Sequence, residues 1–134
     1  MFQNKKIKKF KKQLIVPSCK NNVQKKLVNS LDNLISGKVT DEKEFLDFYS
    51  LDSSAYSKRP RLIVFPKSIE DVKKTIRFAK KRKIPICARG GSTGLVGSSL
   101  TTGIIIDMKN FKKIKLSKNH VTVGAGVSLS LIHI

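Results

Sequence analysis

A glycine-rich stretch at residues 84–103, IPICARGGSTGLVGSSLTTG, constrains the fold more than any other part of the sequence. The apolar run Ile84–Ala88 predicts a short buried strand that leads directly into the glycines. Glycine lacks Cβ, so it adopts positive φ and lets successive backbone N–H groups converge on an anion such as a phosphate. Serine and threonine hydroxyls in the same stretch could complement that charge. The stretch therefore predicts either an anion-binding loop or a plain turn.

The spacing of these glycines indicates which known phosphate-binding loops this stretch does not match. Gly91, Gly94 and Gly97 follow the pattern G-x-x-G-x-x-G. This pattern differs from the dinucleotide fingerprint G-x-G-x-x-G and from the nucleoside-triphosphate loop, which ends in Gly-Lys-Ser/Thr. Those loops open into a helix, whereas this one leads into Ile104–Ile106, which predicts another strand. We therefore expect loop amides, more than a helix dipole, to hold the anion.

A strand and a helix start are predicted before the loop. Residues 61–65 are apolar and lie between Pro60 and Pro66, which is typical of a strand with marked ends. Ser68 is followed three residues later by Asp71, and this pair predicts a helix that begins with a capping box.

The helix after Ser68 is predicted to be amphipathic. Its lysines and arginines fill one face and the C-terminal end, where positive charge suits the helix dipole. The strand, helix, strand order predicts that strands 61–65 and 84–88 are parallel neighbours in one sheet. The predicted buried side of the helix comprises Ile69, Val72, Ile76 and Ala79, with Phe78 beside them.

Further elements are predicted on both sides of this unit. Apolar residues at helical spacing predict an amphipathic helix over residues 22–37, and residues 41–49 suggest a helical turn. After the loop, residues 103–108 predict a third strand. Residues 109–117 and 120–127 predict a hairpin.

The order of these features resembles a known family of flavoenzymes. It is similar to the FAD-binding domain of the vanillyl-alcohol oxidase and p-cresol methylhydroxylase (PCMH) type, most of all in flavin-linked D-lactate dehydrogenases and glycolate oxidase FAD subunits. The resemblance implies an α+β fold, the N-terminal part of a PCMH-type FAD-binding domain, with a mixed sheet and flanking helices. It covers roughly residues 47–128, and its motifs are YSLDSSAY at 49–56, Pro60 to Ser68, Arg89 to Gly97, and VGAGV at 123–127.

The resemblance also implies a set of cofactor-binding residues. In the family, backbone amides of the loop hold the FAD pyrophosphate, and two later glycines let the chain pass close to the isoalloxazine. Ser92 departs from the family, which usually has glycine at this position. Thr93 stands where members with covalently attached flavin carry histidine, so non-covalent FAD is implied. The implied cofactor-binding residues are Arg89, Gly90, Gly91, Ser92, Thr93, Gly94, Gly97, Gly124 and Gly126.

The function implied by the resemblance is that of an FAD-dependent oxidoreductase. A 2-hydroxy acid of the D-lactate or glycolate type would pass a hydride to FAD. A sugar or aryl-alcohol oxidase of the same family is the alternative. The substrate-binding arginines and the catalytic base would lie outside these residues, so no catalytic residue, electron acceptor or iron–sulfur domain is assigned. We expect the 134-residue chain alone to retain FAD weakly or not at all.

The formal net charge of +19 bears on partners and location. Dense Lys and Arg attract nucleic acid or an anionic membrane. The sequence has no aromatic-rich binding strand, zinc-ligand spacing or helix-turn-helix signature, so a small basic nucleic-acid-binding domain is kept only as an alternative. Cys19 and Cys87 have neither metal-ligand nor disulfide spacing, so no metal site is predicted, and Cys87 is expected to be buried. No apolar run reaches the roughly 18 residues of a membrane span, which favours a cytoplasmic protein.

The chain is predicted to divide into four segments. Residues 1–20 form a basic tail, either solvated or in peripheral contact with the inner face of the membrane. Residues 21–46 form a helical lead-in, and residues 47–128 form a truncated FAD-binding domain. Residues 129–134, LSLIHI, resemble the in-frame translation of a transposase adapter end used in sequencing libraries. We therefore expect the native sequence to end near Ser128.

Overall fold

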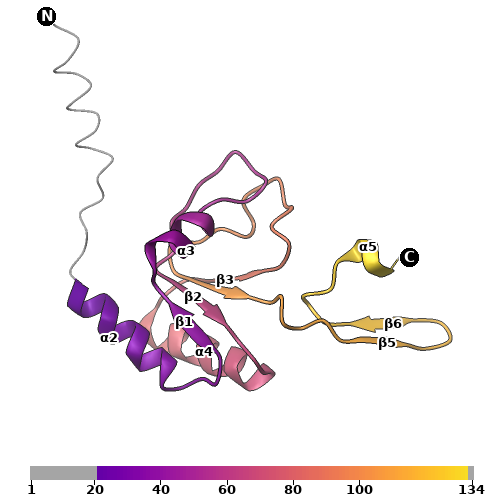
Figure 1. Ribbon diagram of the computed structural model, residues 1–134, viewed down its shortest axis with the longest axis horizontal. Coiled ribbons are helices and arrows are strands. Elements are labelled where there is room, and N and C mark those ends of the chain that lie inside the picture. The colour runs from indigo at the N-terminus through magenta and orange to yellow at the C-terminus, as the bar shows by residue number, and fades with distance from the viewer. Residues whose placement is uncertain (1–20, 133–134) are drawn as a thin grey trace, which may run out of the picture.

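The computed structural model describes residues 21–132 as a four-stranded mixed sheet with flanking helices and a separate hairpin (Figure 1). This arrangement confirms the predicted fold class. The predicted tail at 1–20 and the last two residues lie outside the described part. Within residues 21–132, no helix has the length and apolar character needed to cross a membrane. The elements are α2 (Asn21–Asp32), β1 (Lys38–Thr40), α3 (Lys43–Phe48), β2 (Leu62–Phe65), α4 (Ile69–Arg82), β3 (Ile86–Arg89), β4 (Ile104–Asp107), β5 (Ile114–Leu116), β6 (Val121–Val123) and α5 (Leu129–Ile132).

The sheet has the strand order β1-β2-β4-β3. β1 is antiparallel to β2, and β4 is parallel to both β2 and β3. The prediction that strands 61–65 and 84–88 are neighbours is therefore wrong, because β4 lies between them. The isoleucines of β4 explain its central position: Ile104, Ile105 and Ile106 are all buried, which a strand achieves on both of its faces only inside a covered sheet.

The predicted burial of strand 84–88 is also wrong. β3 is an edge strand with one neighbour, so Ile86 remains 39% exposed and Cys87 is half-buried. The Cys87 thiol donates to the Ser98 carbonyl at 3.1 Å, which places this side chain against the glycine loop. Partial burial raises the pKa of the Cys87 thiol. Arg89 is the one residue of β3 that is buried.

Both faces of the sheet are covered by helices (Figure 1). Side chains alternate across a strand, so Leu62 and Val64 of β2 face one layer and Ile63 faces the other. On the first face, α2 and α4 contribute Leu31 and Phe78 to the core. On the second face, α3 packs Leu46, Tyr49, Ile63 and Ile105 into a smaller cluster.

The predicted capping box of α4 is confirmed. Ser68 Oγ accepts a hydrogen bond from the Asp71 amide at 3.2 Å, and Asp71 Oδ2 accepts one from the Ser68 amide at 3.3 Å. Asp71 is also buried, and it accepts the amides of Lys67 at 2.9 Å and Ser36 at 2.8 Å. The carboxylate therefore joins the start of α4 to the connection between α2 and β1.

The buried side of α4 differs from the prediction. Ile69 and Ile76 are 65% and 42% exposed, whereas Phe78 and Ala79 are buried as expected. Thr75 takes a core position because its hydroxyl donates to the Asp71 carbonyl at 2.8 Å. The helix is thus oriented by its hydrogen-bonded polar residues as well as by its apolar ones.

Of two further predicted elements, the first helix is shorter than predicted and the hairpin is present as predicted. α2 ends at Asp32, short of the predicted residue 37. Gly37 is required for another reason: a Cβ there would lie 2.2 Å from the Phe65 carbonyl oxygen, so glycine lets the chain pass against β2. The predicted hairpin is confirmed, with β5 and β6 paired through Ile114 to Val123 and Leu116 to Val121.

Candidate functional site

The glycine loop, residues 90–103, runs from the end of β3 to the start of β4. It lies beside the connection between α3 and β2 (Figure 1). We call residues 49–56 of that connection the clamp segment, because they make a series of contacts with the loop. The Ser53 amide and hydroxyl each donate to the Ser92 carbonyl at 3.0 Å. The Ser99 hydroxyl donates to Asp52 Oδ2 at 2.9 Å.

Asp52 is fixed by its own segment. Its Oδ1 accepts the Ser54 amide at 2.9 Å and the Ser54 hydroxyl at 2.5 Å. These bonds and the one from Ser99 lower the pKa of Asp52, so it is a carboxylate at neutral pH. The clamp segment therefore holds the glycine loop at two points, Ser92 and Ser99, on either side of Gly94. The sequence motif marked this segment but predicted no role for its side chains.

Arg89, the residue before the glycine loop, belongs to a buried network with Tyr49 and Asp107. Arg89 is 4% exposed, and its guanidinium donates to the Tyr49 carbonyl at 3.0 Å and lies 4.6 Å from the centre of the Tyr49 ring. The Tyr49 hydroxyl donates to Asp107 Oδ2. Arg89 and Asp107 face each other in the β3–β4 register. Burial, reinforced by the bond to Asp107, raises the pKa of Tyr49, so its hydroxyl stays protonated.

This network limits the ways in which Arg89 could contribute to ligand binding. Its guanidinium is directed into the protein and bonded to Tyr49, away from the loop amides. Its predicted contribution to anion binding would therefore come from its position before Gly90 and not from its charge.

Four of the six predicted site glycines form two contrasting pairs. At Gly90 and Gly91, an added Cβ would meet no atom closer than 3.8 Å, so a side chain would fit there at ordinary van der Waals distance. At Gly124 and Gly126, an added Cβ would lie 2.2 Å and 2.3 Å from main-chain oxygens of the chain itself. The second pair is thus needed for the chain's own packing, and its contact with a flavin stays a prediction.

The structure brings the start of the glycine loop and the 124–126 turn together. The atom nearest to a Cβ on Gly90 is the Ala125 carbonyl oxygen, so the loop begins beside the 124–126 turn. Predicted site residues from two separate parts of the sequence therefore share one region.

The middle of the loop contains two residues with positive φ. Ser92 has φ 60° and Gly97 has φ 70°. Gly97 also packs against the clamp segment, because a Cβ there would lie 3.2 Å from Tyr56 Cδ2. Ser92 therefore occupies a conformation that favours glycine, the residue that the resemblance implies for this position.

The backbone amides of the loop are available to a ligand. Within the described part of the chain, no N–H group of residues 91–96 donates a hydrogen bond to the protein. Thr93, Leu95 and Val96 are exposed, so water satisfies these groups in the free chain. Successive N–H groups that converge around a left-handed residue, such as Ser92 here, can bind phosphate oxygens.

Comparisons with known proteins identify a family and several relatives. The model of the FAD binding domain family matches residues 60–133. The chain is 30% identical over 98 residues to a mitochondrial D-lactate dehydrogenase [cytochrome] of Arabidopsis thaliana, an alignment covering 69% of this chain and 17% of that protein. It is 36% identical over 77 residues to glycolate oxidase subunit GlcD of Escherichia coli K12, covering 56% and 15%. The chain therefore spans less than a fifth of the length of either relative.

A solved structure supports the fold. The crystal structure of p-cresol methylhydroxylase with substrate bound superposes with a TM-score of 0.64 at 19% identity, covering 87% of this chain and 25% of that one. At this identity the likeness establishes the fold alone. It agrees with the mixed sheet and flanking helices described above.

Proposed function

The chain belongs to the FAD binding domain family, and we propose that the complete protein is an FAD-dependent oxidoreductase acting on a 2-hydroxy acid of the D-lactate or glycolate type. Relatives named for D-lactate and for glycolate support this substrate class, since both compounds are 2-hydroxy acids. In such an enzyme FAD, when bound, accepts the hydride from the substrate.

The unpaired amides of residues 91–96 carry the proposal. They follow or include Gly90 and Gly91, where the chain packs no atom closer than 3.8 Å to the position of a Cβ, so a ligand could approach the backbone. A pyrophosphate has several anionic oxygens, and a row of N–H donors suits it without any nearby cationic side chain. We assign pyrophosphate binding to these amides and to the hydroxyl of Thr93, with the flavin held non-covalently.

The clamp segment would supply the rigidity that this role requires. Donors bind an anion tightly only when they are ordered beforehand, because ordering a loop upon binding reduces the affinity. Ser53 and Asp52 fix the loop at Ser92 and Ser99 and leave the amides between them unpaired. The contribution of the chain is thus to hold and orient the cofactor.

The test uses the complete protein encoded at the locus. We expect purified protein to contain FAD that acid releases, and to reduce an artificial dye with D-lactate or glycolate. Gly91→Val should lower the FAD content several-fold by placing a side chain beside the amides that would bind the cofactor, whereas Lys118→Ala in the hairpin should not. Dye reduction with aryl alcohols or sugars and not with 2-hydroxy acids would contradict the proposed substrate class.

A further inference from the structure

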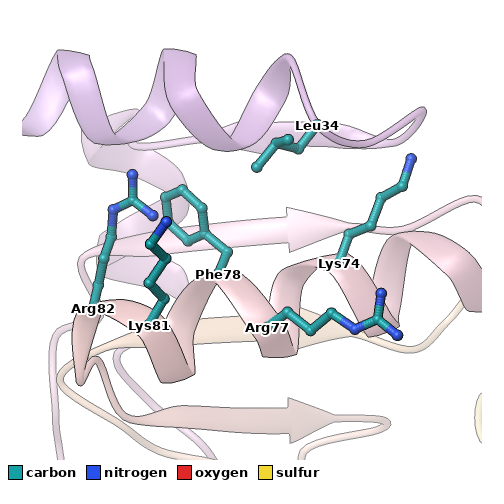
Figure 2. Close-up of a pocket in the computed structure, with 6 residues that line it drawn as sticks. All are labelled: Leu34, Lys74, Arg77, Phe78, Lys81 and Arg82. Carbon is teal, nitrogen blue, oxygen red and sulfur yellow. The ribbon is translucent and has the colours of Figure 1, made fainter.

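A groove with a cationic lining lies between α2 and α4 (Figure 2). Its volume is about 370 Å³. Phe78, which is 4% exposed, forms the apolar floor, and Leu34, which follows α2 and is 48% exposed, forms an apolar wall. Figure 2 shows Leu34 on the α2 side and all the cationic side chains on α4. The cationic residues are Lys74, Arg77, Lys81 and Arg82.

The cations around this groove outnumber the carboxylates near them: Glu70 is the acidic residue whose pKa both Lys74 and Arg77 lower. Within residues 21–132, none of the four cations makes an ion pair, and the one ion pair on α4 joins Lys73 to Glu70. Like charges three and four residues apart destabilise a helix. Arg77 and Lys81 stand in that relationship, so an anionic partner would relieve an existing repulsion.

One of the cations is held in place. The Arg82 guanidinium lies 3.8 Å from the centre of the Phe78 ring, a stacked arrangement that orients its donors at the edge of the floor. An arginine oriented in this way can bind a carboxylate through two parallel hydrogen bonds. The groove thus combines a fixed donor group with an apolar surface.

We propose that this groove docks an acidic segment of a partner protein, in which an apolar side chain is flanked by carboxylates. The apolar side chain would occupy the space between Leu34 and Phe78, and the carboxylates would pair with Arg77 and Arg82. An apolar pocket with a charged rim is the usual arrangement of an energetically dominant interface position. Charge complementarity selects an acidic partner.

Two other kinds of anionic partner fit this groove less well. A lipid headgroup layer is broad, whereas the apolar lining of this groove is limited to Leu34 and the recessed Phe78. A single-stranded nucleic acid would need an exposed aromatic ring face for base stacking, and Phe78, which is 4% exposed, provides none. A small aliphatic side chain needs no such face, because it can pack on Leu34, which is 48% exposed.

The experiment is a titration of the isotope-labelled full chain with an acetylated Glu-Glu-Leu-Glu-Glu peptide, followed by NMR. We expect saturable shifts of the amides of Leu34 and of residues 74–82. A peptide with alanine in place of leucine should bind about tenfold more weakly, because it buries less apolar surface. Leu34→Ser should weaken binding of the leucine peptide and leave binding of the alanine peptide unchanged.

Matched charge variants separate the groove from the general charge of the chain. Arg77→Glu combined with Arg82→Glu should weaken the leucine peptide at least about tenfold. Lys115→Glu combined with Lys118→Glu, which makes the same change in net charge on the hairpin, should leave binding within about twofold. Equal weakening by both pairs, or equal affinity for the two peptides, would overturn the proposal. It would also be overturned if phosphatidylcholine–phosphatidylglycerol vesicles or oligothymidine shifted these amides while the peptide did not.

Discussion

Arg89 donates a 3.0 Å hydrogen bond to the main-chain carbonyl of Tyr49, and this bond ties the residue before the glycine loop to the first residue of the clamp segment. Any residue at position 49 would supply that carbonyl. The tyrosine side chain serves a separate bond, from its hydroxyl to Asp107 in β4. The two bonds can therefore be tested independently.

Tyr49→Phe should lower the free energy of unfolding by about 1–3 kcal/mol. The substitution removes the hydroxyl donor from Asp107, whose buried carboxylate loses a hydrogen bond. Urea denaturation measures the loss. Tyr56→Phe is the control, since Tyr56 is 61% exposed and its change should stay within about 0.5 kcal/mol. Equal losses in the two variants would show that the bond to Asp107 contributes nothing.

Ser92→Gly should raise the stability of the chain by roughly 0.5–1 kcal/mol. Ser92 has φ 60°, where a side chain is strained, and the relief exceeds the extra entropy of glycine in the unfolded chain. Thr93→Gly, at a neighbouring position without positive φ, should be destabilising by a similar amount. Thermal unfolding of the two variants should therefore give shifts of opposite sign, and shifts of the same sign would exclude strain at Ser92.

Gly124→Ala and Gly90→Ala should separate structural glycines from ligand-facing ones. A Cβ at Gly124 would lie 2.2 Å from the Phe111 carbonyl oxygen, so this variant should lose more than about 2 kcal/mol of stability. A Cβ at Gly90 meets nothing within 3.8 Å, so this variant should fold normally. In the complete protein it should instead weaken FAD retention. An unstable Gly90→Ala variant would place this residue in the structural group.

Acid should destabilise the chain partly through Asp71. Burial opposes ionisation of Asp71, but hydrogen bonds from the amides of Ser36, Lys67 and Ser68 outweigh it and lower the pKa. The contribution of this carboxylate is then complete above its unfolded-state pKa of about 3.9 and is lost as the pH falls through the lower folded-state pKa.

Asp71→Asn should remove the part of the acid dependence of stability that comes from Asp71. We expect a loss of about 1–3 kcal/mol at neutral pH and a smaller further loss in acid than in the unmodified chain. Denaturation at a series of pH values measures both. Glu44→Gln, which removes one negative charge at an exposed position of α3, should leave the acid dependence nearly unchanged. An acid dependence of Asp71→Asn equal to that of the unmodified chain would contradict the assignment.

Local features of the fold could be predicted from the sequence, and long-range ones could not. The capping box at Ser68 and the hairpin depend on residues close together in the chain, and both are confirmed. The position of β4 between β2 and β3 depends on which strand gains most from burial. The order of strands and helices along the sequence does not show which strand that is. The orientation of α4 was mispredicted because two polar residues, Asp71 and Thr75, are buried. Asp71 accepts a hydrogen bond from the distant Ser36 amide, and Thr75 satisfies its hydroxyl within the helix by donating to the Asp71 carbonyl.

The candidate site was only partly predictable for the same reason. The glycine spacing marked the loop, and the family match supports FAD as the cofactor, while the binding of FAD at this loop stays a prediction. The sequence did not predict that the Arg89 side chain turns inward or that Asp52 and Ser53 fasten the loop. A cluster of serine and aspartate beside Tyr49 was the available signal, but its partners lie in another part of the chain.

The contacts between the clamp segment and the glycine loop have a consequence for how the site forms. Ser53 and Ser92 are 39 positions apart, and Asp52 and Ser99 are 47 apart. Contacts of this separation require closure of a long stretch of chain, which is entropically unfavourable until the intervening strands and helix are in place. We therefore expect the loop to acquire its shape late in folding, after β2 and α4 have formed. During synthesis, a nascent chain that has emerged only as far as β3 would have the clamp segment without the loop that it holds.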